Sequence, residues 1–328
     1  MKSKSIKDAR ETADRLITNI KKVIVGNDNA IHMVVAALLC RGHVLIEGVP
    51  GVGKTMFARS LALSVSGTFK RIQCTSDLLP SDITGTDIFD QRDREFHFRP
   101  GPVMAHLVLV DEINRAPPKT QSAFLECMEE HQITVDGVTH AMPNPFLLMA
   151  TRNPIHHTGT FPLPETELDR FLTRVRLEYP NSEEEAAIVE RQLTAHPIDT
   201  LKGVVDKQDV LQAQMALSEV YVDRQVTDYA IALVGTTRRH PAVHMGTSPR
   251  SSIALVHLAR AQALLEDRDF ALPDDVKAVA PAVLGHRLVL TAQSHGGASE
   301  DQVIQEIIDS VPVNGRTVSV GSSPSATD

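Results

Sequence analysis

The stretch GHVLIEGVPGVGKT at residues 42–55 decides the fold. It opens with a short β-branched run from His43 to Glu47, which predicts a strand. A turn rich in glycine and proline follows, and apolar periodicity from Lys54 to about Ser66 predicts a helix. A strand, a glycine loop and a helix in this order are typical of a unit that binds phosphate groups.

The glycine loop, residues 48–55, fits the pattern GxxxxGK(S/T) in full. Gly51 and Gly53 permit backbone angles that aim successive N–H groups at an anion, and the following helix N-terminus adds partial positive charge. We expect Lys54 to reach the β- and γ-phosphates of ATP and the Thr55 hydroxyl to bind Mg2+. An ordinary turn before a helix is the alternative interpretation. The residues expected to contact the nucleotide here are Gly48, Val49, Pro50, Gly51, Val52, Gly53, Lys54, Thr55 and Met56.

A pair of carboxylates, Asp111 and Glu112, directly follows the apolar run from Leu107 to Val110. Because that run predicts a central strand, the acids fall at its carboxyl end, where open α/β sheets bind ligands. We expect Asp111 to bind the nucleotide through magnesium and Glu112 to polarise the water that attacks the γ-phosphate. Strand ends often carry charge, so the pair indicates this chemistry mainly because it follows a complete phosphate loop.

Further short apolar runs alternate with turns and helical patterns. They cover Lys70 to Gln73, Leu107 to Val110 and Phe146 to Ala150, and this alternation predicts a parallel α/β sheet. Residues 132–140 place Asp136-Gly137 between two β-prone runs, a strong hairpin signal.

From residue 179 onward the pattern changes, which predicts a second, helical domain without comparable strands. The expected helices are 182–195, 207–218, 223–239, 249–267, 273–284 and 299–310. The last residues are rich in serine and poor in apolar side chains, so we expect a disordered tail at 313–328.

Composition excludes several classes of protein. The 328 residues are 42% hydrophobic and 23% charged, as in ordinary globular proteins. Three widely spaced cysteines suggest neither a disulfide framework nor a zinc site. The apolar runs are too short for a membrane span and no secretion signal is apparent, so we expect a cytoplasmic protein. The net charge of −8 and 4% aromatic content make a nucleic-acid partner a poor fit.

Longer motifs add to these patterns. The chain contains RIQCTSDLLPSDITGTDIFD (71–90), FRPGPV (98–103), DEINRAPPKTQSAFLECMEEHQITVDG (111–137), TRNP (151–154) and FPLPETELDRF (161–171). Together with residues 42–55 they resemble the MoxR family of AAA+ ATPases, over roughly residues 20 to 290. The resemblance implies an α/β fold, a P-loop AAA+ core with a parallel sheet flanked by helices, plus a C-terminal all-α lid. We assign the core to residues 1–178 and the lid to 179–312.

The resemblance also implies roles for residues near the nucleotide. Val25 and Gly26 would line the adenine pocket, where the family usually continues with Gln and this chain has Asn27. Asn153 would be the polar sensor that orients the attacking water beside Glu112. The position before it, commonly Gln, is Arg152, an extra cation near the nucleotide.

Two arginines match positions with catalytic roles in the family. Arg170 matches the arginine finger that reaches the nucleotide of the neighbouring subunit. Arg250 matches the lid arginine that senses the γ-phosphate in its own subunit. Without the resemblance, each would be read as a solvated or ion-paired side chain.

Two excursions from the core could face a pore or a substrate, or could be packed surface hairpins. The insert at about 76–104 resembles the helix insert of the family, with Asp93 and Arg94 at an expected hairpin tip between Phe89 and Phe96. The second is the hairpin at about 132–140. We assign no metal to the histidines, including His156 and His157, and expect Cys127 to be buried rather than nucleophilic.

The resemblance implies a hexameric ring that couples ATP hydrolysis to the remodelling or maturation of a client protein, with a von Willebrand factor A domain protein as partner. Alternatives are the ATPase subunit of a metal chelatase, a nucleic-acid motor, and a nucleotide-gated binding module whose hydrolysis is incidental. The residues expected in catalysis are Glu112, Asn153, Arg170 and Arg250, and those expected to bind magnesium are Thr55 and Asp111.

Overall fold

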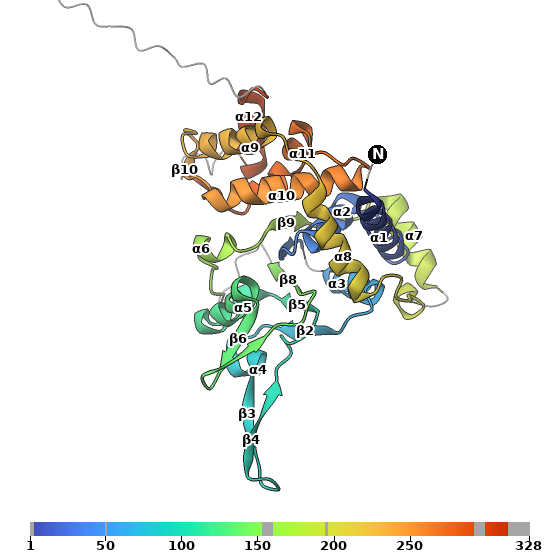
Figure 1. Cartoon of the computed structure of the whole chain (residues 1–328), viewed down its shortest axis with the longest axis vertical. Coiled ribbons are helices and arrows are strands. Elements are labelled where there is room, and N and C mark those ends of the chain that lie inside the picture. The colour runs from blue at the N-terminus through green and yellow to red at the C-terminus, as the bar shows by residue number, and fades with distance from the viewer. Residues whose placement is uncertain (1–2, 50, 153–159, 194–195, 292–298, 314–328) are drawn as a thin grey trace, which may run out of the picture.

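A five-stranded parallel sheet forms the centre of the molecule (Figure 1). The computed structural model describes residues 3–49, 51–152, 160–193, 196–291 and 299–313. Pro50, Asn153, His156, His157 and nearly all of the expected tail lie outside these residues. The strands run in the order β2-β5-β8-β1-β9. Their bounds are β1 Val44–Glu47, β2 Phe69–Gln73, β5 Leu107–Asp111, β8 Leu147–Arg152 and β9 Thr173–Arg176.

The sheet confirms the expected α/β class and adds one strand that the sequence analysis missed. β9 pairs with β1 in parallel, with Val44 opposite Thr173 and Glu47 opposite Arg176. Its sequence, TRVR, alternates with arginine and so lacks the apolar run that marks the other strands. Arg174 is nevertheless buried, because it is paired with carboxylates at the sheet edge.

Apolar residues of the strands alternate between two cores. Val44 and Ile46 of β1 belong to the core on the side of α1 (Lys4–Ile20), α2 (Asp28–Leu39) and α3 (Lys54–Ser64). Leu45 belongs to the opposite core, which contains Phe124 of α5 (Pro118–Glu130). Because successive side chains point to opposite faces, a strand covered on both sides is apolar throughout. Shorter elements here are α4 Pro80–Thr84, the 3-10 turn Ile113–Arg115 and α6 Glu165–Leu168.

Both expected hairpins form. One pairs β3 (Gly85–Asp90) with β4 (Glu95–Pro100) and extends away from the sheet (Figure 1). Its tip includes Arg94 at a φ of 63°, and the Phe89 and Phe96 rings lie 5.3 Å apart. The other pairs β6 (Gln132–Val135) with β7 (Val138–Ala141), through Asp136 and Gly137, which both have positive φ. Two adjacent positive φ angles are the geometry that makes Asp-Gly a hairpin signal.

The C-terminal part is mainly helical. Its helices are α7 Ser182–Gln192, α8 Lys207–Ala216, α9 Arg224–Thr237, α10 Pro249–Leu265, α11 Pro273–Leu284 and α12 Glu300–Ser310, with 3-10 turns at Pro197–Asp199 and Leu217–Glu219. α9 to α12 gather on one side of the sheet, whereas α8 packs along α1 (Figure 1).

The expectation of a strand-free lid is wrong in one detail. β10 (Val243–Met245) and β11 (Val289–Leu290) form a two-stranded antiparallel sheet. Strands of this length carry no readable alternation, so only their meeting in the fold reveals them.

Two buried histidines lie between the sheet and its neighbours. His43 accepts a hydrogen bond at Nδ1 from the Leu148 N–H at 3.0 Å, and its Nε2 donates to the Met128 carbonyl at 3.1 Å. Burial lowers the pKa of His43 to about 4, and burial likewise holds the pKa of His286 well below its usual value. Both imidazoles are therefore neutral in the folded chain at neutral pH.

We expect acidification to destabilise the fold through His43. The unfolded histidine titrates near pH 6.5 and the folded one near pH 4, so the unfolded chain binds more protons between these values. The stabilisation is fully present above pH 6.5 and is lost as the pH falls to about 4, at up to about 1.4 kcal/mol per pH unit. Urea unfolding across this range should show a shallower decline for His43→Asn than for the unsubstituted chain. His244→Asn, on an exposed face of β10, is the control, and an unchanged slope in His43→Asn would contradict the assignment.

Candidate active site

The loop between β1 and α3 has the backbone shape that its sequence predicts. Gly51 and Gly53 have φ of 90° and 84°, a region that other residues rarely adopt. At Gly48 a Cβ would lie only 2.9 Å from the Leu177 carbonyl oxygen. The loop therefore needs glycine at all three positions, and it leads directly into α3, whose N-terminus favours an anion.

Lys54 begins α3 and folds back over this loop. Its Nζ donates a hydrogen bond to the Gly48 carbonyl at 2.7 Å. Partial burial lowers the pKa of Lys54, while the nearby Asp111 and Glu112 act in the opposite direction. The ammonium group is thus held between the glycine loop and the acidic pair, where a phosphate would need it.

Asp111 lies at the end of β5 and faces the start of α3. Its Oδ2 accepts a hydrogen bond from Thr55 Oγ1 at 3.4 Å, and its Oδ1 accepts one from Thr151 Oγ1 at 3.1 Å. Arg71 of β2 pairs with the same carboxylate at 2.6 Å. A hydroxyl and a carboxylate at this spacing are hard oxygen ligands of the type that magnesium prefers, so Thr55 and Asp111 fit the expected metal.

Glu112 turns away from Asp111. Its φ of 56° places it in the left-handed region, and its N–H donates to Thr151 Oγ1 at 2.8 Å. Its carboxylate pairs with Arg115 at 2.9 Å and is 36% exposed. Adjacent acids thus occupy different surroundings, one buried beside Thr55 and one open to solvent. The Thr151 hydroxyl hydrogen-bonds to both acids, since it donates to the Asp111 carboxylate and accepts the Glu112 N–H. The place of Thr151 in the TRNP motif could have suggested this role.

A buried carboxylate, Glu47, gathers three arginines beside the glycine loop. It pairs with Arg152, with Arg174 at 3.5 Å and with Arg176 at 3.7 Å. The side chains of Glu47 and Arg174 are only 8% and 4% exposed. Arg152, expected near the nucleotide from the family resemblance, lines a cavity with Gly48 and Val49. Glu47, Arg174 and Arg176 were not expected here, because no sequence spacing singles them out.

Helix α12 of the C-terminal part closes this arginine cluster. Arg174 pairs with Asp301 at 3.3 Å, and Arg176 pairs with Asp301 and with Glu300 at 3.4 Å. These contacts draw the start of α12 against the carboxyl edge of the sheet.

A cavity of ≈ 570 Å³ opens beside the cluster between the core and the C-terminal helices. Asn27 lines it with Arg174, Tyr179 and Glu184, and its volume is within the range of small-molecule sites. Gly26 has a φ of 69°, and a Cβ there would come within 2.6 Å of the Glu184 carboxylate. Asn27 Oδ1 accepts a hydrogen bond from the Glu178 N–H at 3.1 Å. The lining of this cavity begins at Asn27, directly after the expected adenine residues Val25 and Gly26, whose contact with adenine stays a prediction.

The two expected arginines, Arg170 and Arg250, lie together at another place. Both pair with Glu129 of α5, Arg170 at 3.2 Å. With Gly42 and His43 they line a second cavity at the amino end of β1, whereas the phosphate loop follows the carboxyl end. In this arrangement Arg250, at the start of α10, pairs with Glu129 of α5 and lines the cavity at the amino end of β1 rather than the phosphate loop. Its role as a sensor of the γ-phosphate stays a prediction.

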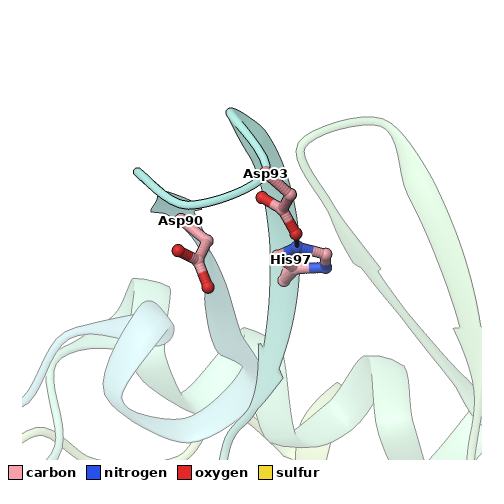
Figure 2. Close-up of side chains that lie close together, drawn as sticks. All are labelled: Asp90, Asp93 and His97. Atoms are coloured by element: carbon pink, nitrogen blue, oxygen red, sulfur yellow. Dashed lines mark hydrogen bonds and ion pairs between the residues drawn. The ribbon is translucent and has the colours of Figure 1, made fainter.

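A separate group of potential metal ligands lies at the tip of the β3–β4 hairpin. Figure 2 shows Asp90, Asp93 and His97 with their side chains close together. The Asp90 and Asp93 carboxylates accept the Arg92 and Glu95 N–H groups, at 2.8 and 3.0 Å, and Asp93 also pairs with His97. These contacts account for the cluster as a hairpin-tip turn, and we assign no metal to it.

Comparison with known proteins identifies the family. Residues 43–173 match the ATPase family associated with various cellular activities (AAA), and residues 235–307 match the AAA lid domain. Chaperone MoxR1 of Mycobacterium tuberculosis is 43% identical over 306 residues, which cover 90% of this chain and 80% of that protein. The chain belongs to the MoxR family of AAA+ ATPases.

Other MoxR relatives agree with this assignment. Protein MoxR of Methylorubrum extorquens is 31% identical over 307 residues, 86% of this chain and 89% of that protein. A crystal structure of a protein from Cytophaga hutchinsonii superimposes with a TM-score of 0.87 at 36% identity, covering 94% of this chain and 96% of the other. Within the described part of the chain, no helix is long and apolar enough to cross a membrane.

We expect Glu47 to be essential to the stability of the sheet edge. Glu47→Ala leaves Arg174 buried without its nearest strand partner, which should lower the free energy of unfolding by about 3 kcal/mol. Asp301→Ala removes a carboxylate that is 45% exposed and should cost less than about 1 kcal/mol. Urea unfolding of both variants measures the difference, and equal losses would show that burial of the Glu47 cluster is unimportant.

Proposed function

We propose that this MoxR protein is a ring-forming ATPase that couples Mg-ATP hydrolysis to the remodelling or maturation of partner proteins. One observation carries the proposal. The glycine loop, Lys54 and the pair Asp111 and Glu112 lie together at one edge of the sheet, beside a cavity of nucleotide size.

Nucleotide binding would rest on the loop and on α3. The N–H groups around Gly51 and Gly53 would receive the phosphates, and Lys54 would leave the Gly48 carbonyl for their oxygens. Thr55 and Asp111 would hold magnesium, which when bound supplies positive charge to the phosphate oxygens. The adenosine would occupy the cavity that Asn27, Tyr179 and Glu184 line.

Hydrolysis would depend on Glu112. Its position next to Asp111 but outside the buried pocket suits a group that polarises the attacking water, and its contact with Arg115 holds the carboxylate in place. Asn153, one residue beyond the end of β8, would orient the same water.

Arg170 and Arg250 would act on the nucleotide of a neighbouring subunit. Their place at the amino end of β1 supports a role across an interface, because both guanidinium groups lie away from their own phosphate loop. Positive charge near the equatorial oxygens is the main requirement of phosphoryl transfer. Each site would then need two subunits, and a closed hexamer would complete every site.

Protein remodelling is supported by kinship with a protein named Chaperone MoxR1. The β3–β4 hairpin exposes Phe89 and Phe96, which are 48% and 68% exposed, and it would contact the client or the pore. A von Willebrand factor A domain protein would be the partner, in the cytoplasm.

A shared site predicts that activity depends on assembly. ATPase activity per subunit should rise with protein concentration and be unaffected by DNA, and Arg170→Ala should lower it by about 10³-fold. Arg224→Ala, which removes an arginine 85% exposed on α9, is the matched control and should keep full activity. Activity that ignores concentration and survives Arg170→Ala would instead indicate a self-contained nucleotide switch.

Glu112→Gln should separate binding from turnover. The variant keeps the loop, Lys54 and Asp111, so ATP should bind with nearly unchanged affinity while hydrolysis falls by about 10²-fold or more. A fluorescent ATP analogue and phosphate release measure the two properties, with Lys54→Ala as the variant that loses affinity and Glu11→Gln as the neutral one. Near-normal hydrolysis in Glu112→Gln would remove this residue from the mechanism.

A further inference from the structure

The backbone that carries Arg170 is held from the lid by Arg287. The guanidinium Nη2 of Arg287 donates to the Phe171 carbonyl at 2.6 Å and to the Asp169 carbonyl at 3.2 Å. Its Nε lies 2.9 Å from the Asp169 carboxylate, and its Nη1 donates to the Val283 carbonyl of α11 at 2.7 Å. Arg287 therefore binds the main chain on both sides of Arg170 and ties it to a lid helix.

Two more lid groups contact Asp169 and Phe171, the residues on either side of Arg170. His286 donates from Nε2 to the Phe171 carbonyl at 3.0 Å, and Ser248 donates its hydroxyl to the Asp169 carboxylate at 2.8 Å. Ser248 is also the N-cap of α10, where its Oγ accepts the Arg250 N–H at 3.2 Å. Residues 169–171 of the core thus contact the lid at Ser248, His286 and Arg287. Arg250 is connected to this contact because its N–H donates to Ser248 Oγ.

Burial makes this arrangement costly unless every group is paired. The Arg287 side chain is 4% exposed, and taking a cation out of water costs several kcal/mol before its partners compensate. Burial lowers the pKa of Arg287 to about 10, which leaves it charged at neutral pH. An apolar side chain would fill the same space without that cost, but it would not grip two carbonyls and a carboxylate.

We propose that Arg287 is a positioning residue that sets the place of Arg170 from the lid, so that lid orientation controls the arginine offered to the neighbouring subunit. This inference rests on the role of Arg170 under the proposed function. A lid that turns on the core must move the carbonyls of Asp169 and Phe171, and Arg170 lies between them. Lid movement in one subunit would then change the position of Arg170 at the nucleotide of the next subunit.

The chain offers a matched control for a purely structural role. Arg268 is another largely buried lid arginine, 19% exposed and paired with Asp275 and Glu266, but its partners lie within the lid. Arg287→Lys and Arg268→Lys both replace a guanidinium fork by a single ammonium, which cannot span several acceptors. If Arg287 only stabilised the lid, the two substitutions would have similar consequences.

The first measurement tests, in the full chain, whether Arg287 orders the backbone around Arg170. The Arg170, Phe171 and Leu172 amides donate to Glu167, Leu168 and His43 carbonyls at 3.2, 3.1 and 2.9 Å, so their hydrogen exchange reports the order of this segment. Arg287→Lys should accelerate exchange there by about ten-fold or more, while Arg268→Lys leaves it unchanged. Unchanged exchange in Arg287→Lys would overturn the proposal.

The second measurement tests the connection to Arg170 through activity. Arg287→Lys should lower kcat roughly ten-fold while KM for ATP changes less than about two-fold, because its own nucleotide site is intact. The double variant Arg170→Ala/Arg287→Lys should be no slower than Arg170→Ala. An additional loss in the double variant would mean that Arg287 acts by another route.

Mixed rings separate the two sides of the interface. Lys54→Ala subunits lack a working nucleotide site but keep Arg170 and Arg287, so mixing them with Arg287→Lys subunits should restore turnover at the shared sites. Mixing Arg170→Ala with Arg287→Lys should give no such recovery. Failure of the first mixture to recover would overturn the positioning role. Full activity of Arg170→Ala alone would instead overturn the proposed function. The functional role of Arg287 would then fail too, even if hydrogen exchange shows that Arg287 orders residues 170–172.

Discussion

The buried carboxylate of Glu47 joins three strands at the carboxyl edge of the sheet. β1 supplies the acid, β8 supplies Arg152, and β9 supplies Arg174 and Arg176. The same arginines reach Asp301 of α12, so the edge that ends in the phosphate loop is also the edge that the lid touches. A buried charge must be compensated from all sides. This requirement keeps the strand ends, the loop and the lid in one arrangement. It also means that the Arg152 guanidinium is paired with Glu47.

The two ends of strand β1 have chemically different surroundings. At the carboxyl end of β1 lie the glycine loop, Lys54 and the acidic pair, which together suit a phosphate and a magnesium ion. At the amino end lie Arg170 and Arg250, both paired with Glu129. Under the proposed function, a ring brings Arg170 and Arg250 of one subunit to the phosphate loop of its neighbour. Glu129 would then hold the two arginines together until a phosphate competes for them.

The lid contacts both ends, through Glu300 and Asp301 at the nucleotide side and through Ser248, His286 and Arg287 at the arginine side. Under the proposed function, a lid that contacts both ends of β1 would connect the nucleotide site of one subunit with the arginines that it offers to the next. The division between core and lid at residue 178 stays a prediction.

The sequence by itself determined the strand, loop and helix of residues 42–55, the acidic pair, most helices and both hairpins. These features depend on local patterns: an apolar period, glycine where φ must be positive, and Asp-Gly at a turn. The tertiary structure alone decided that β9 pairs with β1, that Glu47 binds three arginines, and that Arg250 lies beside Arg170 rather than its own phosphate loop. These outcomes depend on contacts between residues far apart in the chain, and a buried arginine has the same letter as an exposed one until its partners are in place.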